Sequence, residues 1–289
     1  MSISQPRLAT VQCLSPSGLH HMAYTEWGDP ANPRVLVCVH GLTRCGRDFD
    51  VLAQALSDVY RVVCPDVVGR GASDWLKNPA GYAVPQYVSD MVTLIARLGA
   101  THVDWFGTSM GGLIGMGLAG VPDTPIRKML LNDVGPRINA PALTRIGDYL
   151  GQAPRFPTLD ACIDYLRMTS LPFGPHTAAE WRALSLPLIR QENDYFVLRY
   201  DPAIAVPFAA VTPQLAMAGE MALWAALEAF DGPVLVARGE QSDLLSRETV
   251  AEMKMRGRQV SSVEIPGVGH APTFVHDDQI RVAREFFVK

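Results

Sequence analysis

Short apolar runs alternate with amphipathic stretches along most of the 289-residue chain. This alternation predicts a mostly parallel sheet that is covered by helices on both faces. The expected strands lie near residues 8–13, 20–27, 35–39, 61–65, 103–107, 129–133, 233–238 and 261–265. The first two are joined through a Ser-Pro-Ser-Gly turn, which predicts an antiparallel hairpin at the edge of the eight-stranded sheet.

Between the later strands the pattern changes to a helical period. Helices are expected near residues 47–57, 86–98, 110–120, 246–257 and 277–287. The helix over 86–98 carries its apolar residues on one predicted face, namely Val88, Met91, Val92, Ile95 and Leu98. We expect this helix to stop at Gly99, because glycine is common directly after a helix C-terminus.

The regular alternation breaks between residues 136 and 222, where prolines separate short amphipathic pieces. Short helices broken by prolines suit a lid laid over a site better than a further strand and helix. The predicted organisation is therefore an α/β core formed by residues 1–135 and 223–289, with a helical cap inserted at 136–222.

Composition narrows the possible partners. Hydrophobic residues make up 48% of the chain and charged residues 19%, which is typical of a globular enzyme. The net charge of −4 provides neither a basic surface for nucleic acid nor a polybasic membrane anchor. The chain has no apolar stretch of about 18 residues, and residues 1–13 lack the apolar core of a signal peptide, so we expect neither a membrane span nor a cleaved leader.

The cysteines give the expected compartment. The five of them are scattered and include no Cys-x-x-Cys pair. An odd, dispersed set with members inside apolar strand candidates predicts reduced core thiols in a cytoplasmic protein. The oligomeric state cannot be inferred from the sequence.

A serine between two glycines is the strongest chemical signal. Gly107-Thr108-Ser109-Met110-Gly111 follows an apolar strand and precedes a predicted helix. Glycines allow the tight strand-to-helix turn that exposes a nucleophilic serine, and the helix N-terminus offers free N–H groups to an oxyanion. Ser109 is therefore the predicted nucleophile.

Ser109 needs a base and an acid, because a serine hydroxyl is a poor nucleophile by itself. Of the seven histidines, His270 lies in a glycine-flanked loop after the last predicted strand and is the expected base. Asp243, which follows strand 233–238, is the favoured acid for orienting that histidine. Asp133, at the end of strand 129–133, is the competing candidate.

With the order Ser109, Asp243, His270, the chain resembles the α/β-hydrolase superfamily over nearly its whole length. The resemblance implies an oxyanion hole made by the backbone N–H groups of Leu42, in the stretch His40-Gly41-Leu42, and of Met110. His40 is expected to shape that loop rather than to react.

Candidate substrate-binding residues are less defined. Arg44 either meets a substrate carboxylate or is a solvated loop residue, Arg190 lies where some relatives carry a cap arginine, and Trp181 either lines an acyl pocket or packs the cap. We found no cluster with the sequence spacing of metal ligands and no dinucleotide fingerprint, so no cofactor is expected.

The predicted activity is hydrolysis of a small carboxylic ester, or of a lactone or thioester, through an acyl-enzyme. Two alternatives remain open: a carbon–carbon bond hydrolase of the meta-cleavage type, and a ligand-binding member of the fold without turnover.

Overall fold

Eight strands form one sheet in the computed structural model, which describes residues 5–288. Residues 1–4, part of the segment in which we expect no leader, lie outside the described residues. The spatial order is β1-β2-β4-β3-β5-β6-β9-β10. The strands are β1 (Arg7–Ser15), β2 (Gly18–Trp27), β3 (Val35–Val39), β4 (Arg61–Pro65), β5 (Val103–Thr108), β6 (Ile126–Asn132), β9 (Val234–Gly239) and β10 (Val260–Ile265).

The sheet has the predicted pairing. β1 and β2 form the antiparallel edge hairpin, β2 joins β4 antiparallel, and the pairs from β4 through to β10 are parallel. This confirms the expected mostly parallel eight-stranded sheet.

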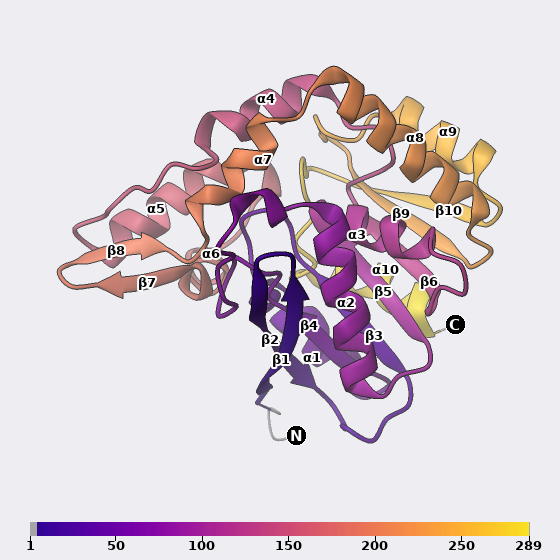
Figure 1. The fold of residues 1–289 in the computed structure, drawn as a ribbon, viewed down its shortest axis with the longest axis horizontal. Helices are drawn as coiled ribbons and strands as arrows, with labels where there is room; N and C mark the ends of the chain where they lie inside the picture. Colours follow the sequence, from indigo (N-terminus) through magenta and orange to yellow (C-terminus); the bar gives the residue numbers. More distant parts are fainter. Residues whose placement is uncertain (1–4, 289) are drawn as a thin grey trace.

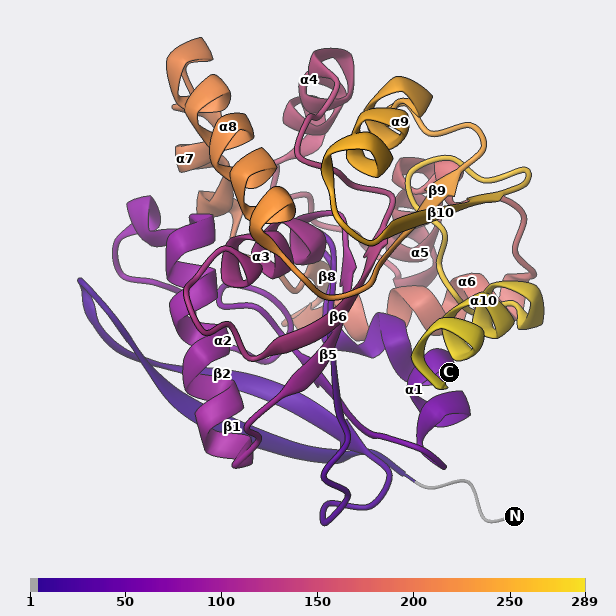
Figure 2. The same ribbon diagram turned by 90° about the vertical axis from the view of Figure 1, so that its right-hand side faces the viewer.

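Helices cover both faces of the sheet (Figures 1 and 2). α1 (Asp50–Leu56) and α10 (Asp277–Val288) share one apolar cluster, and α2 (Val84–Leu98), α3 (Met110–Ala119), α8 (Pro213–Ala229) and α9 (Arg247–Arg256) share the other. The expected helix 47–57 is divided into a 3₁₀ turn, Gly46–Phe49, and α1.

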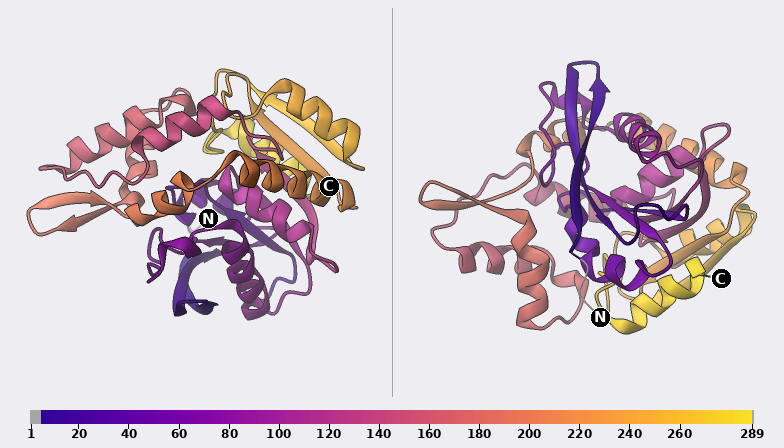
Figure 3. Two further views of the ribbon diagram at one scale, coloured as in Figure 1. Left: turned by 45° about the horizontal axis from the view of Figure 1, so that its top comes forward. Right: turned by 90° about the horizontal axis from the view of Figure 1, so that it is seen from below.

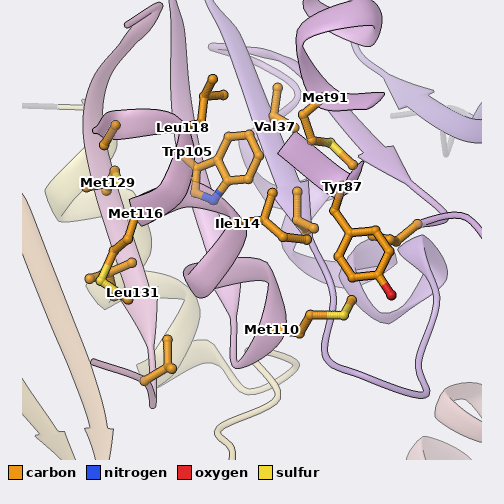
Figure 4. Packing of buried hydrophobic residues seen from close by; sticks show 14 of the residues in the cluster. Val37, Tyr87, Met91, Trp105, Met110, Ile114, Met116, Leu118, Met129 and Leu131 are labelled. Atoms are coloured by element: carbon orange, nitrogen blue, oxygen red, sulfur yellow. The ribbon is translucent and has the colours of Figure 1, made fainter. Parts of the chain in front are cut away.

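The central strands read as continuous apolar runs because both of their faces are buried. Trp105 of β5 and Leu131 of β6 point to the α2 and α3 side, whereas Phe106 and Leu130 point to the α1 and α10 side. Figure 4 shows Trp105 packed against Ile114 of α3. Successive side chains of a strand point to opposite faces, so the period of two divides the core into two clusters.

Helix α2 corrects one detail of the predicted pattern. Met91 is fully buried, but Val92 is 48% exposed. Leu94, which the pattern left out, is fully buried instead. The helix begins at Val84 and stops where expected, with Gly99 at a left-handed φ of 66°.

Residues 136–222 leave the sheet and extend beyond its edge (Figures 1 and 3). They contain helices as expected and also a two-stranded hairpin, which projects farthest from the sheet. The elements are α4 (Ala140–Tyr149), α5 (Leu159–Thr169), α6 (Ala178–Ser185), β7 (Ile189–Glu192), β8 (Tyr195–Leu198), α7 (Ala205–Ala209) and the first part of α8. The predicted cap boundary at 222 falls inside α8.

Short 3₁₀ turns complete the secondary structure, at Pro79–Gly81, Leu171–Phe173, Leu186–Leu188 and Pro202–Ile204. In the described part of the chain, no single helix is both long and apolar enough to cross a membrane, although the bent pair Pro202–Ala209 and Pro213–Ala229 reaches that length and composition when counted together.

All five cysteine thiols are free and buried. Burial raises the pKa of Cys13, which also lies beside Asp90, to about 12, and burial raises the pKa of Cys162 to about 11. These thiols therefore stay protonated at neutral pH and behave as small apolar side chains.

The burial difference within α2 predicts a difference in stability. Leu94→Ala should lower the free energy of unfolding by about 2–5 kcal/mol because it leaves a cavity under the sheet. Val92→Ala on the exposed side should change it by less than about 0.5 kcal/mol. Urea unfolding of the two variants measures both values, and equal losses would contradict the described orientation of α2.

Candidate active site

Ser109 occupies the turn between β5 and α3 with a φ of 51°, in the region that side chains rarely adopt. The flanking glycines make this turn sterically possible. A Cβ at Gly111 would lie 2.0 Å from the Val39 carbonyl oxygen, and one at Gly107 would lie 2.4 Å from the Gly111 carbonyl oxygen. Both approaches involve backbone atoms that cannot move aside, so only glycine fits at these two positions.

His270 reaches Ser109 from the loop after β10. Its Nε2 lies 2.9 Å from the Ser109 Oγ, and its Nδ1 lies 2.8 Å from Oδ2 of Asp133. A carboxylate can only accept, so Nδ1 carries the proton and Nε2 is left to accept from the serine hydroxyl. The three side chains form one continuous hydrogen-bonded line.

Asp133 is fully buried at the end of β6, the strand next to β5. Besides His270, its carboxylate accepts the Gly239 N–H at 2.8 Å and the Ser242 hydroxyl at 2.7 Å. Three donors thus surround a charge that would be costly to bury alone. The end of β9 and the turn after it, where we expected the acid, supply two of these donors.

Asp243 does not contact His270, so the prediction that Asp243 lies beside this histidine is wrong. Its side chain is 45% exposed and pairs with Arg145 of α4, through bonds of 2.8 and 3.0 Å. Asp133 and Asp243 both lie between Ser109 and His270 in the chain, so chain order cannot distinguish them. The two aspartates differ in the strand that they follow, because β6 adjoins the serine strand whereas β9 is one strand farther away.

The loop after β3 is fixed beside Ser109 by buried polar contacts. His40 Nδ1–H donates to the Gly41 carbonyl at 2.7 Å, and its Nε2 accepts the Val67 N–H at 2.9 Å. Complete burial lowers the pKa of His40 to about 3, so the ring is neutral and holds the loop as predicted. Arg70, which the sequence did not single out, binds the Leu42 carbonyl at 2.8 Å.

Two backbone N–H groups remain the predicted oxyanion donors. Met110 is the first residue of α3, so its N–H has no acceptor within the helix. Leu42 follows Gly41, where a Cβ would lie 3.8 Å from the Ser109 Cβ. The Leu42 loop and the α3 N-terminus therefore both border the serine.

A pocket opens above Ser109 and His270. Its walls are largely apolar and come from the loop after β3, the His270 loop and the segment inserted after β6. The apolar wall residues of that segment are Ile146, Tyr149, Leu166, Phe173, Leu184 and Leu188. Apart from His270, the titratable groups that line it are Arg44, Asp48, Arg145 and Tyr149.

The three candidate binding residues have different surroundings in the structure, and only Arg44 lines the pocket. Arg44 lines the pocket but is buried. Its Nε and Nη2 both donate to the Asp48 carboxylate, and Nη2 also donates to the Leu184 carbonyl. Arg190 pairs with Glu192 outside the pocket wall. Trp181 stacks on Phe173 with ring centroids 6.4 Å apart, so it supports the wall from behind.

Within residues 5–288, the fold brings together one group of metal-ligand residue types, Cys13, His20 and Asp90, although their sequence spacing gave no such signal. All three are buried. Asp90 accepts from His20 at 3.0 Å and from Gln86 at 2.8 Å, which accounts for the carboxylate as part of a hydrogen-bonded network between the edge hairpin and α2.

Comparison with known proteins agrees with this geometry. A 3-hydroxybutyrate-oligomer hydrolase of Cupriavidus necator is 62% identical over 288 residues, and the match covers 98% of each chain. The crystal structure of an alpha/beta hydrolase from Novosphingobium aromaticivorans superposes with a TM-score of 0.83 at 34% identity, and that of a Rickettsia typhi protein with 0.88 at 29%; each match covers 99% of both chains.

A family model described as the alpha/beta hydrolase family matches residues 36–285, a range that contains the serine turn, the aspartate after β6 and the histidine loop. The match spans most of the chain, and the fold has the sheet order and the helical layers described above. The chain belongs to the alpha/beta hydrolase family.

Proposed function

We propose that this protein is a serine ester hydrolase that cleaves short linear oligomers of 3-hydroxybutyrate. The observation that carries the proposal is the hydrogen-bonded line Ser109–His270–Asp133, of which Ser109 and His270 line an apolar pocket. The 62% identity to a 3-hydroxybutyrate-oligomer hydrolase over almost the whole chain supports the choice of substrate. Both the family and this relative support the more general conclusion that the protein is a hydrolase.

The reaction follows from the positions of the groups. His270 Nε2 takes the proton of Ser109 as Oγ attacks the ester carbonyl, and the carbonyl oxygen becomes an oxyanion held by the N–H groups of Leu42 and Met110. The C–O bond of the alcohol half then breaks, and the imidazolium gives its proton to that oxygen. Water, activated by the same histidine, hydrolyses the acyl-enzyme and releases the free acid.

Asp133 serves this cycle by holding the histidine. Its 2.8 Å contact keeps the proton on Nδ1, and its negative charge stabilises the imidazolium that forms after proton transfer. Side-chain burial of Asp133 is complete, so water does not screen this attraction.

The alternatives of the sequence analysis have weaker support. Arg190, the feature shared with the carbon–carbon hydrolases, pairs with Glu192 and does not line the pocket. A ligand-binding protein without turnover would not require the connected serine, histidine and aspartate. A lactone or thioester would react by the same steps as an ester.

The buried free thiols suit a reducing compartment, so we place the protein in the cytoplasm.

The substrate is tested with the purified protein and the linear 3-hydroxybutyrate dimer. Wild type should release the monomer, and Ser109→Ala should lower kcat by about 10⁴-fold or more because the nucleophile is lost. Stopped-flow hydrolysis of p-nitrophenyl acetate should show a burst of nitrophenol that disappears in Ser109→Ala. Turnover of the nitrophenyl ester without turnover of the dimer would remove the proposed substrate but keep the esterase.

The identity of the acid is tested with a matched pair of variants. Asp133→Asn should lower kcat for p-nitrophenyl acetate by about 10⁴-fold, because an amide no longer enforces the required histidine tautomer. Asp243→Asn breaks only an exposed ion pair and should change kcat by less than about fivefold. Far-ultraviolet circular dichroism checks that both variants are folded. A large loss in Asp243→Asn alone would reverse our assignment.

A further inference from the structure

The pocket wall contains one arginine whose ion-pair partner lies outside the wall. Arg44 and Asp48 neutralise each other through two short bonds, from Nε to Oδ2 at 2.7 Å and from Nη2 to Oδ1 at 2.6 Å. Arg145 is the remaining charged side chain of the wall, because its partner Asp243 is not among the lining residues. The wall therefore has one cation that a substrate can meet.

The guanidinium of Arg145 already holds a carboxylate in the geometry that a ligand would use. Nε and Nη2 contact the two oxygens of Asp243 at 2.8 and 3.0 Å, which is the two-bond arrangement that arginine makes with planar anions. Both side chains are open to solvent, with 37% of Arg145 and 45% of Asp243 exposed. An exposed ion pair of this kind contributes little to stability, so another carboxylate can replace Asp243.

The position of Arg145 relates this cation to the reaction. It lies on α4, next to Ile146 and one turn before Tyr149, and all three line the pocket that has Ser109 at its floor. An ester bound at Ser109 can thus extend along apolar groups toward a cation. That arrangement suits a short, mostly apolar ester that ends in an anion.

We propose that Arg145 forms a carboxylate subsite, and that the enzyme selects esters with a free carboxylate on their alcohol half. This inference rests on the proposed function and deepens it. In a linear hydroxyacid oligomer, the free carboxylate lies on the alcohol side of every ester bond. Arg145 therefore binds the leaving group, whereas the acyl half with its hydroxyl end stays on Ser109.

The subsite does not involve Arg44, which the sequence offered either as a carboxylate-binding residue or as a solvated loop residue. The Nε and Nη2 groups of Arg44 already donate to the Asp48 carboxylate and the Leu184 carbonyl inside the wall. Arg44 instead joins the loop after β3 to α6, while Arg145 keeps an exchangeable partner. The role of Asp243 changes with this assignment, because its carboxylate competes with that of the substrate.

The test compares the 3-hydroxybutyrate dimer with its neutral carboxamide in wild type, Arg145→Gln and Asp243→Asn. Wild type should have the higher kcat/KM for the acid. Arg145→Gln should reduce the acid-to-amide ratio of kcat/KM by about two- to fivefold, mainly through the KM of the acid, because an exposed ion pair with the substrate carboxylate is lost. Asp243→Asn should lower the KM of the acid by up to about fivefold, because the competitor is gone.

Arg182→Gln is the matched control, since it removes an exposed arginine that pairs with Asp160 on the same inserted segment outside the pocket wall. Its acid-to-amide ratio should equal that of wild type. Equal use of acid and amide by wild type, or a ratio that Arg145→Gln leaves unchanged, overturns the subsite while the esterase stands.

Inhibition separates this inference from the choice of substrate. With p-nitrophenyl acetate as reporter, free 3-hydroxybutyrate should inhibit wild type more strongly than 3-hydroxybutyramide does, and Arg145→Gln should abolish the difference. If neither dimer were cleaved but this difference appeared, the proposed substrate would fail and the carboxylate subsite would stand. Absence of the difference would refute the subsite.

Discussion

The buried carboxylate of Asp133 is the interaction on which the site depends. It accepts hydrogen bonds from the Gly239 N–H, the Ser242 hydroxyl and His270, and so ties the end of β6 to the turn after β9 and to the loop after β10. An ionised side chain in the core is tolerable only with such donors, so each of these three segments is restricted to a narrow range of positions. This restriction keeps the His270 ring within hydrogen-bond distance of Ser109.

Close backbone packing is the second constraint. Helix α3 lies so near to β3 and β5 that Gly107 and Gly111 have no space for a Cβ, and at Gly115 a Cβ would lie 2.3 Å from the Trp105 ring. Trp105 in turn donates its indole N–H to the Gly111 carbonyl at 3.0 Å. The same packing that fills the core under α3 therefore holds Ser109 in its unusual backbone conformation and aims the helix N-terminus at the pocket.

Much of the protein follows from the sequence by local rules. The short apolar runs located all eight strands of the sheet to within a few residues, and the reason is clearest for the central strands, because a strand buried on both faces needs an unbroken apolar run. The flanking glycines singled out Ser109 as the predicted nucleophile, and the loop after the last strand singled out His270 as the predicted base; the two side chains lie 2.9 Å apart. Val92 shows the limit of this reasoning, because a helical wheel gives the apolar face but not the edge at which a neighbouring element stops covering it.

The sequence by itself thus determined the layered α/β fold, the serine turn and the histidine loop, because each depends on residues that are close together in the chain. Only the tertiary structure put Asp133 rather than Asp243 beside His270, placed Arg145 in the pocket wall and left Arg190 and Trp181 outside it. These outcomes depend on which strand lies beside β5 and on how the inserted helices pack over the sheet. Both are set by contacts between residues about 20 to 160 positions apart, for which neither spacing nor composition carries a signal.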